Sequence, residues 1–349
     1  HCAMLKIQPF MSSGLFPIEH YWHLYAGLSV AVIFLVLLDL GVFHKSAKER
    51  SLKECVLWTG LWVSLAVSFG WLMSFYLTHR GDVPPGGVRK AVLEYFSCYL
   101  LEWSLSIDNV FAFLLVFQFF RIRPKYHSRI LFLGICGAVF FRAVFIAAGA
   151  WLVRFQAALI VFGVIILVSG LKMMLLGDGG AEEGPPRWML RLQDWVRFDS
   201  ASEGDHFFIR RDGKLWATRA FLALMAIEMS DLVFAVDSVP AAFGITKDPF
   251  LIFSSNVLAI LGLRSLFFVL SHMARAFHLL RYGVAIVLVL IGVKMAIITP
   301  VFDYHFPPGV WFAIIATCLG ASIGLSAVFK PPPEIEKIQP PEAESGDPV

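Results

Sequence analysis

Residues 228–241 read Glu-Met-Ser-Asp-Leu-Val-Phe-Ala-Val-Asp-Ser-Val-Pro-Ala and place three carboxylates within a long apolar run. An ionisable group in the hydrocarbon of a bilayer costs at least about 2.5 kcal/mol, so it occurs there with a partner or beside water. Helical spacing puts Glu228, Asp231 and Ser238 on one face, with Asp237 next to it. The stretch therefore predicts a membrane helix that carries a polar site.

The rest of the chain has the composition of a membrane protein. Of its 349 residues, 58% are hydrophobic and 16% are charged, and the mean hydropathy is +0.72, well above that of soluble domains. The net charge of only +3 gives no basis for nucleic-acid binding. Five cysteines stand singly, so we expect no disulfide framework, no zinc or iron–sulfur site and no permanent cofactor: Cys2, Cys55, Cys98, Cys136 and Cys318.

About nine segments are long and apolar enough to cross a bilayer, because a spanning helix needs about 20 mostly apolar residues. The expected fold class is thus an all-α membrane protein in contact with lipid. Nothing in the sequence indicates an oligomeric state. The predicted spans are 21–43, 55–77, 91–119, 130–153, 157–176, 219–239, 250–271, 282–299 and 309–329.

Lys and Arg residues in the connecting segments indicate how the spans are oriented. With nine spans the termini lie on opposite sides, and the side richer in Lys and Arg is normally the cytoplasm. The N-terminal segment and the loops on its side hold six of these residues, whereas the other side holds eighteen. We expect an inner-membrane protein with its N-terminus outside and its C-terminus in the cytoplasm.

The spans divide the chain into six parts. Asp212 and Gly213 favour a small β-hairpin in the central loop, because an Asp-Gly pair suits a two-residue turn. The tail is rich in Pro and Glu, which is typical of disorder. The parts are an N-terminal segment with two peripheral spans (1–90), a first three-helix repeat (91–176), a cytoplasmic loop (177–218), a second three-helix repeat (219–299), the last span (300–330) and the disordered tail (331–349).

An internal repeat relates the two three-helix parts. The residues Asp-Asn-Val-Phe-Ala-Phe from position 108 match Asp-Leu-Val-Phe-Ala-Val from position 231 at four of six positions. The order Asp, Arg, Lys then recurs at intervals of 34 and 30 residues in the first part and 33 and 30 in the second, as Asp108, Arg142 and Lys172 and as Asp231, Arg264 and Lys294. Because the loop between the parts stays on one side, they have opposite orientations. Inverted 3+3 repeats are typical of transporters, although a purely structural duplication remains an alternative.

Ten ionisable residues inside the predicted spans are candidates for a functional role, and Glu94 is left out because it lies close to its interface. The carboxylates outnumber the cations by two, which leaves a formal charge that one divalent cation can balance. The carboxylates are Asp39, Glu102, Asp108, Glu228, Asp231 and Asp237, and the cations are Arg142, Arg264, Lys172 and Lys294.

A second acidic string lies in the first repeat. Helical spacing puts Glu102, Ser106 and Asn109 on one face, with Asp108 beside them. Carboxylate, hydroxyl and amide oxygens suit Mg²⁺, Ca²⁺ and Mn²⁺. All ten histidines fall in loops or near span ends, which argues against zinc, copper and nickel. The candidate metal ligands are Asp39, Glu102, Asp108, Asn109, Glu228, Asp231, Asp237 and Ser238.

Several of these residues also have a purely structural interpretation. Lys172 and Lys294 lie near span ends, where a lysine can extend to the interface. Arg142 and Arg264 are deeper and can hold carboxylates as structural ion pairs. Asp39 lies near a helix end, where a solvated carboxylate is as reasonable as a ligand.

Two further residues extend the candidate site. Pro240 follows the second acidic string, and a helix end or break there would free backbone carbonyls for the ligand set. Asn256 is a further oxygen donor or, alternatively, a polar helix–helix contact. Since Glu102 precedes its Asp by six residues and Glu228 by only three, we expect one asymmetric midplane site, built more by the second repeat than the first.

At these strings the sequence resembles the TerC/Alx family of integral membrane proteins, which is related to the LysE-type exporter superfamily. The matching stretches are Glu-Trp-Ser-Leu-Ser-Ile-Asp-Asn-Val-Phe (102–111), residues 228–241, and Ser-Asn-Val-Leu-Ala-Ile-Leu-Gly-Leu-Arg-Ser-Leu-Phe-Phe (255–268). Similarity covers about residues 20–330. One departure is Ala-Thr-Arg-Ala (217–220), where members of the family usually have Thr-Pro-Leu.

The resemblance implies manganese export or homeostasis. It assigns metal handling to acidic residues of these motifs, here Glu102, Asp108, Glu228, Asp231 and Asp237. The family also carries labels of tellurium resistance and of a membrane redox modulator. We therefore expect a Mn²⁺ transporter, with proton coupling, and keep as an alternative a membrane stress-response or assembly protein whose intramembrane charges are structural ion pairs. No nucleophile–base arrangement or cofactor motif points to an enzyme.

Overall fold

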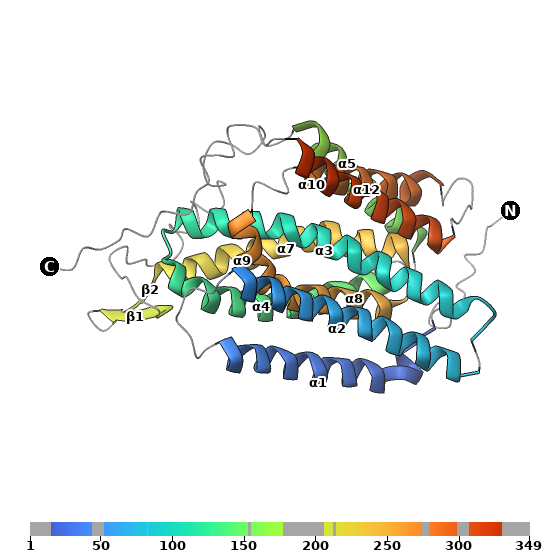
Figure 1. Ribbon diagram of the computed structural model, residues 1–349, viewed down its shortest axis with the longest axis horizontal. Coiled ribbons are helices and arrows are strands. Elements are labelled where there is room, and N and C mark those ends of the chain that lie inside the picture. Colours follow the sequence, from blue (N-terminus) through green and yellow to red (C-terminus); the bar gives the residue numbers. More distant parts are fainter. Residues whose placement is uncertain are drawn as a thin grey trace.

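The computed structural model describes residues 15–43, 52–81, 83–152, 155–176, 206–211, 214–273, 279–298 and 307–329. These residues form a bundle of long helices with one β-hairpin at one end (Figure 1). The side chains of Asp39 and Asp108 lie outside the described part, as do the predicted tail and most of the central loop. The chain is thus an all-α membrane protein apart from the hairpin.

Eleven helical segments and two strands make up the described chain. The helices before the hairpin are α1 (Ile18–Phe43), α2 (Leu52–His79), α3 (Gly87–Phe119), α4 (Pro124–Leu152) and α5 (Gln156–Leu176). The strands are β1 (Phe208–Arg211) and β2 (Lys214–Ala217). The helices after it are α7 (Arg219–Ile245), α8 (Pro249–Leu261), α9 (Leu263–Met273), α10 (Leu280–Val293), the π-helical turn η4 (Lys294–Ile298) and α12 (Pro308–Val328).

Fewer helices than the nine predicted spans are long and apolar enough to be identified as membrane spans. In the described ranges, four helices are long and apolar enough to cross a membrane, namely α1, α2, α4 and α12. The pair α8 and α9, bent by 45°, gives a fifth. The helices α3 and α7 carry the acidic strings and are 33 and 27 residues long, but they are not among the five. The four qualifying helices and the bent pair make the chain a multi-pass integral membrane protein.

The predicted helix end at Pro240 is wrong. Helix α7 continues through Pro240 to Ile245. Proline removes a single backbone donor, and neighbouring groups in a membrane bundle can compensate for that loss. The break occurs instead at Gly262, between α8 and α9, where a Cβ atom would lie 3.3 Å from the Cβ of Trp62 on α2. Glycine therefore allows α2 to approach the bend.

The hairpin leads directly into α7. Its strands pair antiparallel, with Phe208 opposite Ala217. Thr218 then caps the helix, since its side chain accepts a hydrogen bond from the backbone nitrogen of Phe221. The Phe208 and Phe221 rings lie 4.5 Å apart between centroids. A capping threonine suits this position, so Arg219 can begin the helix without the usual proline.

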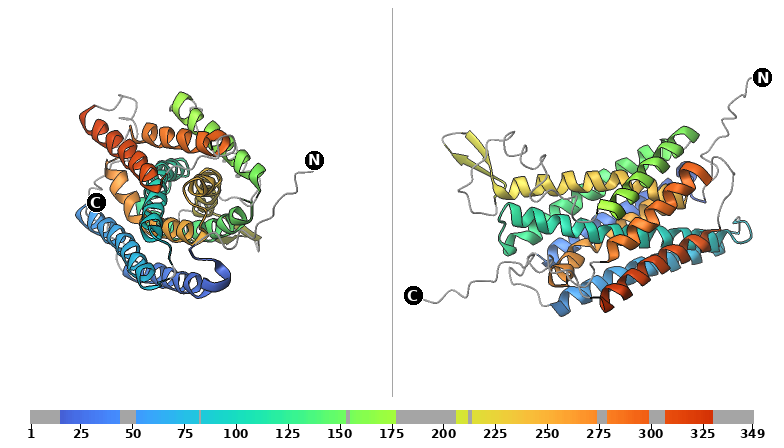
Figure 2. Two further views of the ribbon diagram at one scale, coloured as in Figure 1. Left: turned by 90° about the vertical axis from the view of Figure 1, so that its right-hand side faces the viewer. Right: turned by 90° about the horizontal axis from the view of Figure 1, so that it is seen from above.

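Helices α3 and α7 lie at the centre of the bundle (Figure 2). Helix α3 packs against α2, α7, α8 and α12, and α7 packs against α3, α4 and α5. On another side, α5 and α10 approach closely: a Cβ at Gly170 would lie 2.8 Å from the nitrogen of Val289, and one at Gly292 would lie 2.6 Å from the nitrogen of Leu167. Small residues allow such backbone contact between membrane helices.

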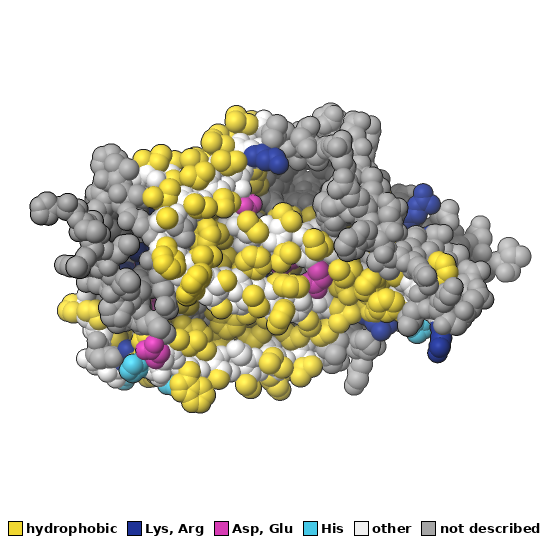
Figure 3. All heavy atoms as spheres, turned by 180° about the vertical axis from the view of Figure 1, so that it is seen from behind, with side chains coloured by type: hydrophobic (Ala, Val, Ile, Leu, Met, Phe, Trp, Pro, Cys, Tyr) yellow, Lys and Arg dark blue, Asp and Glu magenta, His cyan; other side chains and the backbone are white. Residues whose placement is uncertain are grey.

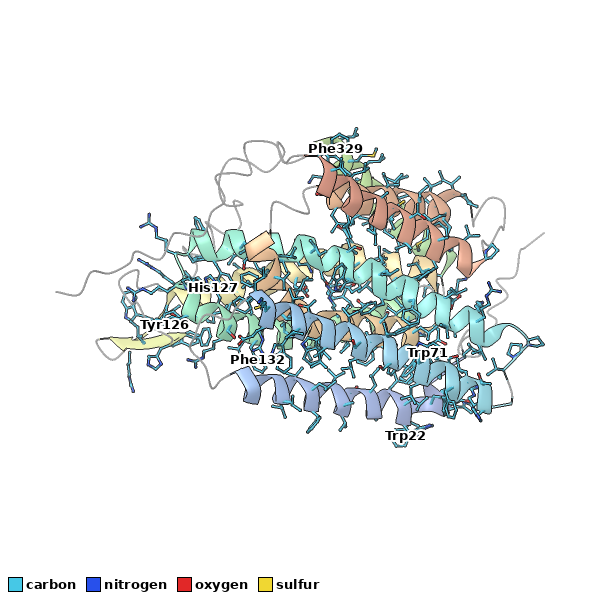
Figure 4. The ribbon with its side chains drawn as sticks, in the orientation of Figure 1. Trp22, Trp71, Tyr126, His127, Phe132 and Phe329 are labelled. Atoms are coloured by element: carbon cyan, nitrogen blue, oxygen red, sulfur yellow. The ribbon has the colours of Figure 1, made fainter. Side chains whose placement is uncertain are left out.

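The outside of the bundle is apolar. Hydrophobic side chains cover most of the described part of the face in Figure 3. Trp71 is 73% exposed and, with Trp22, lies on the outer side of α2 and α1, whereas Tyr126 and His127 lie near the hairpin end (Figure 4). Tryptophan and tyrosine are enriched at membrane–water interfaces. This surface is suited to contact with lipid.

Candidate functional site

Arg142 of α4 lies at the centre of a buried polar cluster. Its side chain is 1% exposed and forms ion pairs with Glu102 of α3 and, at 3.3 Å, with Asp231 of α7. The same guanidinium donates hydrogen bonds to Ser238 Oγ at 3.3 Å and to Asn256 Oδ1 of α8 at 3.1 Å. We call these five residues, together with Asn109, the Arg142 cluster. It joins four helices that come from both predicted repeats.

The spacing of the two acidic strings explains why their side chains meet. Glu102 and Asn109 are seven residues apart on α3, and Asp231 and Ser238 are seven apart on α7, so each pair shares a helix face. Asn109 Nδ2 donates to Asp231 Oδ1 at 3.5 Å. The predicted faces are therefore brought together, with Arg142 inserted between them from α4.

Several buried polar atoms of the cluster and of the neighbouring Ser106 are unpaired. Two carboxylates surround one guanidinium, which leaves a formal charge of −1 when all three are ionised. Among the described residues, no hydrogen-bond partner reaches Asp231 Oδ2, Asn109 Oδ1 or Ser106 Oγ, and the donors Arg142 Nε and Asn256 Nδ2 are also without one. Buried polar atoms are normally paired. The cluster can therefore accommodate a polar or charged guest.

Glu228 lies one turn before Asp231 on α7, and its carboxylate rests against Gly137 of α4. A Cβ atom at Gly137 would overlap the carboxylate, so glycine provides the space that it occupies. Glu228 Oε2 is buried and has no hydrogen-bond partner among the described side chains. Since α7 begins at the hairpin, Glu228 lies on the hairpin side of Asp231.

Other predicted site residues lie elsewhere. Asp237 accepts a hydrogen bond from Ser169 Oγ of α5 at 2.9 Å and so faces a different helix from Asp231. Arg264 is buried directly after the bend at Gly262. Lys172 is exposed on α5, as an interfacial lysine would be. Among the described residues, no three His, Cys, Asp or Glu side chains gather in the way that holds a metal ion.

Lys294 turns into the protein instead of extending to the interface, which was one of the interpretations that the sequence left open. It is 8% exposed, donates to the carbonyl oxygen of Gly244 at 2.6 Å, and lies 4.5 Å from the centroid of the Trp311 ring. Glu94, which is not among the predicted ligands, is equally buried and accepts a hydrogen bond from Thr246 Oγ1 at 2.7 Å. The missed signal was its position eight residues, or about two helical turns, before Glu102.

A single antiparallel seam connects these groups. Helices α3 and α7 run antiparallel, so a step toward the N-terminus of α3 corresponds to an equal step toward the C-terminus of α7. The last matched position lies just past the end of α7. The matched contacts are Asn109 with Asp231, Glu102 with Ser238 through Arg142, Cys98 with the carbonyl of Ala242, and Glu94 with Thr246. Buried polar side chains therefore follow the seam from the Arg142 cluster to the end of the bundle opposite the hairpin.

Comparison with known proteins assigns the chain to a family. The model of the integral membrane protein TerC family matches residues 88–331. A protein of Salmonella typhi named "Putative membrane-bound redox modulator Alx" is 38% identical over 87% of this chain and 92% of its own length. An uncharacterized membrane protein of Myxococcus xanthus, STKORF319, is 41% identical over the same shares.

The Alx protein of Escherichia coli K12 is 35% identical over 86% of this chain and 91% of its own length. No solved structure matches the chain. The family model covers both acidic strings and all four helices of the Arg142 cluster. The chain therefore belongs to the TerC family of integral membrane proteins.

Proposed function

We propose that the chain is a secondary transporter that exports Mn²⁺ from the cytoplasm in exchange for protons. The observation that carries the proposal is the set of unpaired buried oxygens on Asp231, Asn109 and Ser106, in and beside a cluster with more carboxylates than cations. Oxygen donors of this kind suit a hard divalent cation. Glu228, with its unpaired oxygen, extends the same set toward the hairpin.

Competition between Arg142 and the cargo supplies the exchange step. The guanidinium in this structure contacts the two carboxylates, Glu102 and Asp231, that the proposal assigns to the cation. A divalent cation bound there repels the guanidinium, so the ion pairs of Arg142 and the bound cation exclude one another. Protons that neutralise the carboxylates release either partner. One set of groups thus binds metal in one state and protons in another.

We propose that the chain crosses the membrane nine times and contains a 3+3 inverted repeat. Two packing features support the repeat: α3 packs against α8 as α4 packs against α7, and the contact of Gly170 with Val289 has its counterpart in that of Gly292 with Leu167. The offset of 122 residues that aligns the two glycines also aligns Leu167 with Val289. Transporters with inverted repeats bind their substrate where the halves meet.

We also propose an inner-membrane location with the N-terminus outside. The excess of Lys and Arg in the segments on the hairpin side supports this orientation. Under this orientation the hairpin and Glu228 face the cytoplasm, and the end of the bundle that holds Glu94 and Lys294 faces outward. Cargo would therefore enter at Glu228.

Cellular manganese tests the proposal. We expect cells that overproduce the chain to retain less manganese than cells with an empty vector, by elemental analysis at a matched external concentration. The variants Asp231→Asn and Asp108→Asn should abolish the difference at equal membrane abundance. Equal manganese in cells with the wild-type chain and with the empty vector would refute the proposal.

A structural or redox role is the second candidate. It is favoured by the ion pairs of Arg142, which also suit a purely structural contact, and by the names of the Alx relatives. Under this candidate, the exchange Glu102→Arg with Arg142→Glu restores function, and the purified chain binds no divalent cation saturably.

A further inference from the structure

A second group of buried polar residues closes the seam at the end opposite the hairpin. It consists of Glu94 on α3, Gly244 and Thr246 at the end of α7, Lys294 on η4 and Trp311 on α12, and we call it the Lys294 cluster. Glu94 and Lys294 are each 8% exposed, although both belong to residue types that are rarely buried without a partner. The cluster is separate from the Arg142 cluster, which lies about two turns deeper along α3.

The groups around the Lys294 ammonium are those that bind a cation. Gly244 lies in the last turn of α7, where carbonyl oxygens have no partner within the helix and the helix dipole is negative. Its oxygen accepts from Lys294 Nζ at 2.6 Å, and the ammonium lies over the Trp311 ring. Glu94 reaches the same helix end, because its carboxylate accepts a hydrogen bond from Thr246, two residues after Gly244. Thr246 and, from the surface, Lys90 at 3.9 Å hold the Glu94 carboxylate.

The Lys294 cluster lies on the path that the seam defines. Glu94, Cys98 and Glu102 are four residues apart and share one face of α3. Cys98 is buried between the two clusters, and its thiol contacts the carbonyl oxygen of Ala242 at 3.9 Å. A cation that leaves the Arg142 cluster along the seam would therefore meet Cys98 first and then the Lys294 ammonium.

We infer that the Lys294 cluster is a second site for a divalent cation, and that the Lys294 ammonium occupies it as a tethered cation that closes the outward end of the path. The inference rests on the proposed transport function. The departing cation replaces the ammonium at the Gly244 carbonyl and is also bound by the Glu94 carboxylate, and the ammonium returns once the cation has left. Lys172 occupies the matching position of the first repeat, but its side chain is exposed and does not close the path.

Labelling of Cys98 tests this closure without measuring transport. The probe is a small membrane-impermeant thiosulfonate reagent, applied outside to cells that carry the full chain with Cys98 as its only cysteine. We expect Lys294→Met, which keeps the side-chain length, to label about tenfold faster than its parent, the factor that corresponds to about 1.4 kcal/mol of closing free energy. Lys294→Arg keeps the charge and should remain within about twofold of the parent. Lys172→Met is the matched control and should not change the rate.

Two further measurements distinguish a cation site that the ammonium has left from a gap that the substitution opens in the packing. In Lys294→Met the uncompensated Glu94 carboxylate keeps the vacated site hydrated and open. The double variant Glu94→Gln with Lys294→Met removes that charge as well, so the neutral site should close and its labelling should return to within about twofold of the parent. Added MnCl₂ should slow the labelling of Lys294→Met but leave that of the double variant unchanged. An unchanged rate in Lys294→Met, fast labelling in the double variant, no protection by Mn²⁺, or faster labelling only from the cytoplasmic side would each overturn the inference. Failure of the proposed transport appears instead as unchanged cellular manganese, with the labelling results intact.

Discussion

Replacement of Arg142 by methionine should leave two buried carboxylates without their cation. The side chain makes two ion pairs, with Glu102 and Asp231, and two neutral hydrogen bonds, with Ser238 and Asn256. Hydrogen bonds between membrane helices average about 0.6 kcal/mol each, whereas removing one partner of a buried ion pair costs about 3–5 kcal/mol. The uncompensated charges therefore dominate, and we expect Arg142→Met to lower the free energy of unfolding by at least about 3 kcal/mol.

Neutralising the carboxylates should recover most of this loss. Replacing a complete buried ion network by neutral groups of similar volume is often close to neutral. The triple variant Arg142→Met, Glu102→Gln and Asp231→Asn should thus lie within about 1–2 kcal/mol of the wild type, the remainder coming from the lost hydrogen bonds. Recovery of stability without recovery of manganese export would separate the two roles of these residues.

Equilibrium unfolding of the purified chain in mixed micelles, followed by tryptophan fluorescence, measures both variants. The matched control is Lys172→Met, which removes an exposed cation and should change stability by less than about 0.5 kcal/mol. A loss of under 1 kcal/mol in Arg142→Met would refute the reasoning, since the charges would then be solvated or protonated at little cost. A triple variant as unstable as the single one would refute it as well, because packing and not charge would be responsible.

Three further predictions concern positions where the structure leaves little freedom. Gly137→Ala would put a methyl group into the Glu228 carboxylate and should reduce manganese export severalfold. The control Gly60→Ala faces open space and should leave export unchanged. Equal export in both variants would contradict the placement of Glu228. Gly292→Ala forces a Cβ against a backbone nitrogen of α5 and should cost about 1–3 kcal/mol in unfolding free energy; a neutral result would mean that the two helices are farther apart. Thr218→Ala should cost about 1 kcal/mol by loss of the α7 cap, and Thr218→Ser should retain most of it in the same unfolding assay.

The sequence predicted the faces of α3 and α7 better than it predicted their neighbours. Helical periodicity determines that Asp231 shares a face with Ser238, and the structure brings that face to Glu102 and Asn109. The same periodicity cannot tell which helix approaches Asp237, which contacts α5. Which elements lie side by side is a property of the whole bundle, and one chain without its relatives carries no direct signal for it.

Two residues differ from an interpretation that the sequence allowed, each for a local physical reason. Pro240 was expected to end its helix, but a proline costs one hydrogen bond, and a continuous α7 keeps all the others. The position of Lys294 near a span end was equally compatible with an interfacial lysine, but a carbonyl and an aromatic ring bind its ammonium within the protein. Distance from a span end is therefore a weak guide where a long side chain can turn inward instead of outward.

The position of Arg142 also constrains how the chain is made. Synthesis proceeds from the N-terminus, so α3 and α4 enter the membrane before α7 and α8 exist. During that interval Glu102 is the one carboxylate of the cluster that Arg142 can reach, and an arginine in hydrocarbon without a partner costs several kcal/mol. The Glu102 contact thus lets a half-finished chain retain α4 in the bilayer, and Asp231 later completes an arrangement that was already inserted.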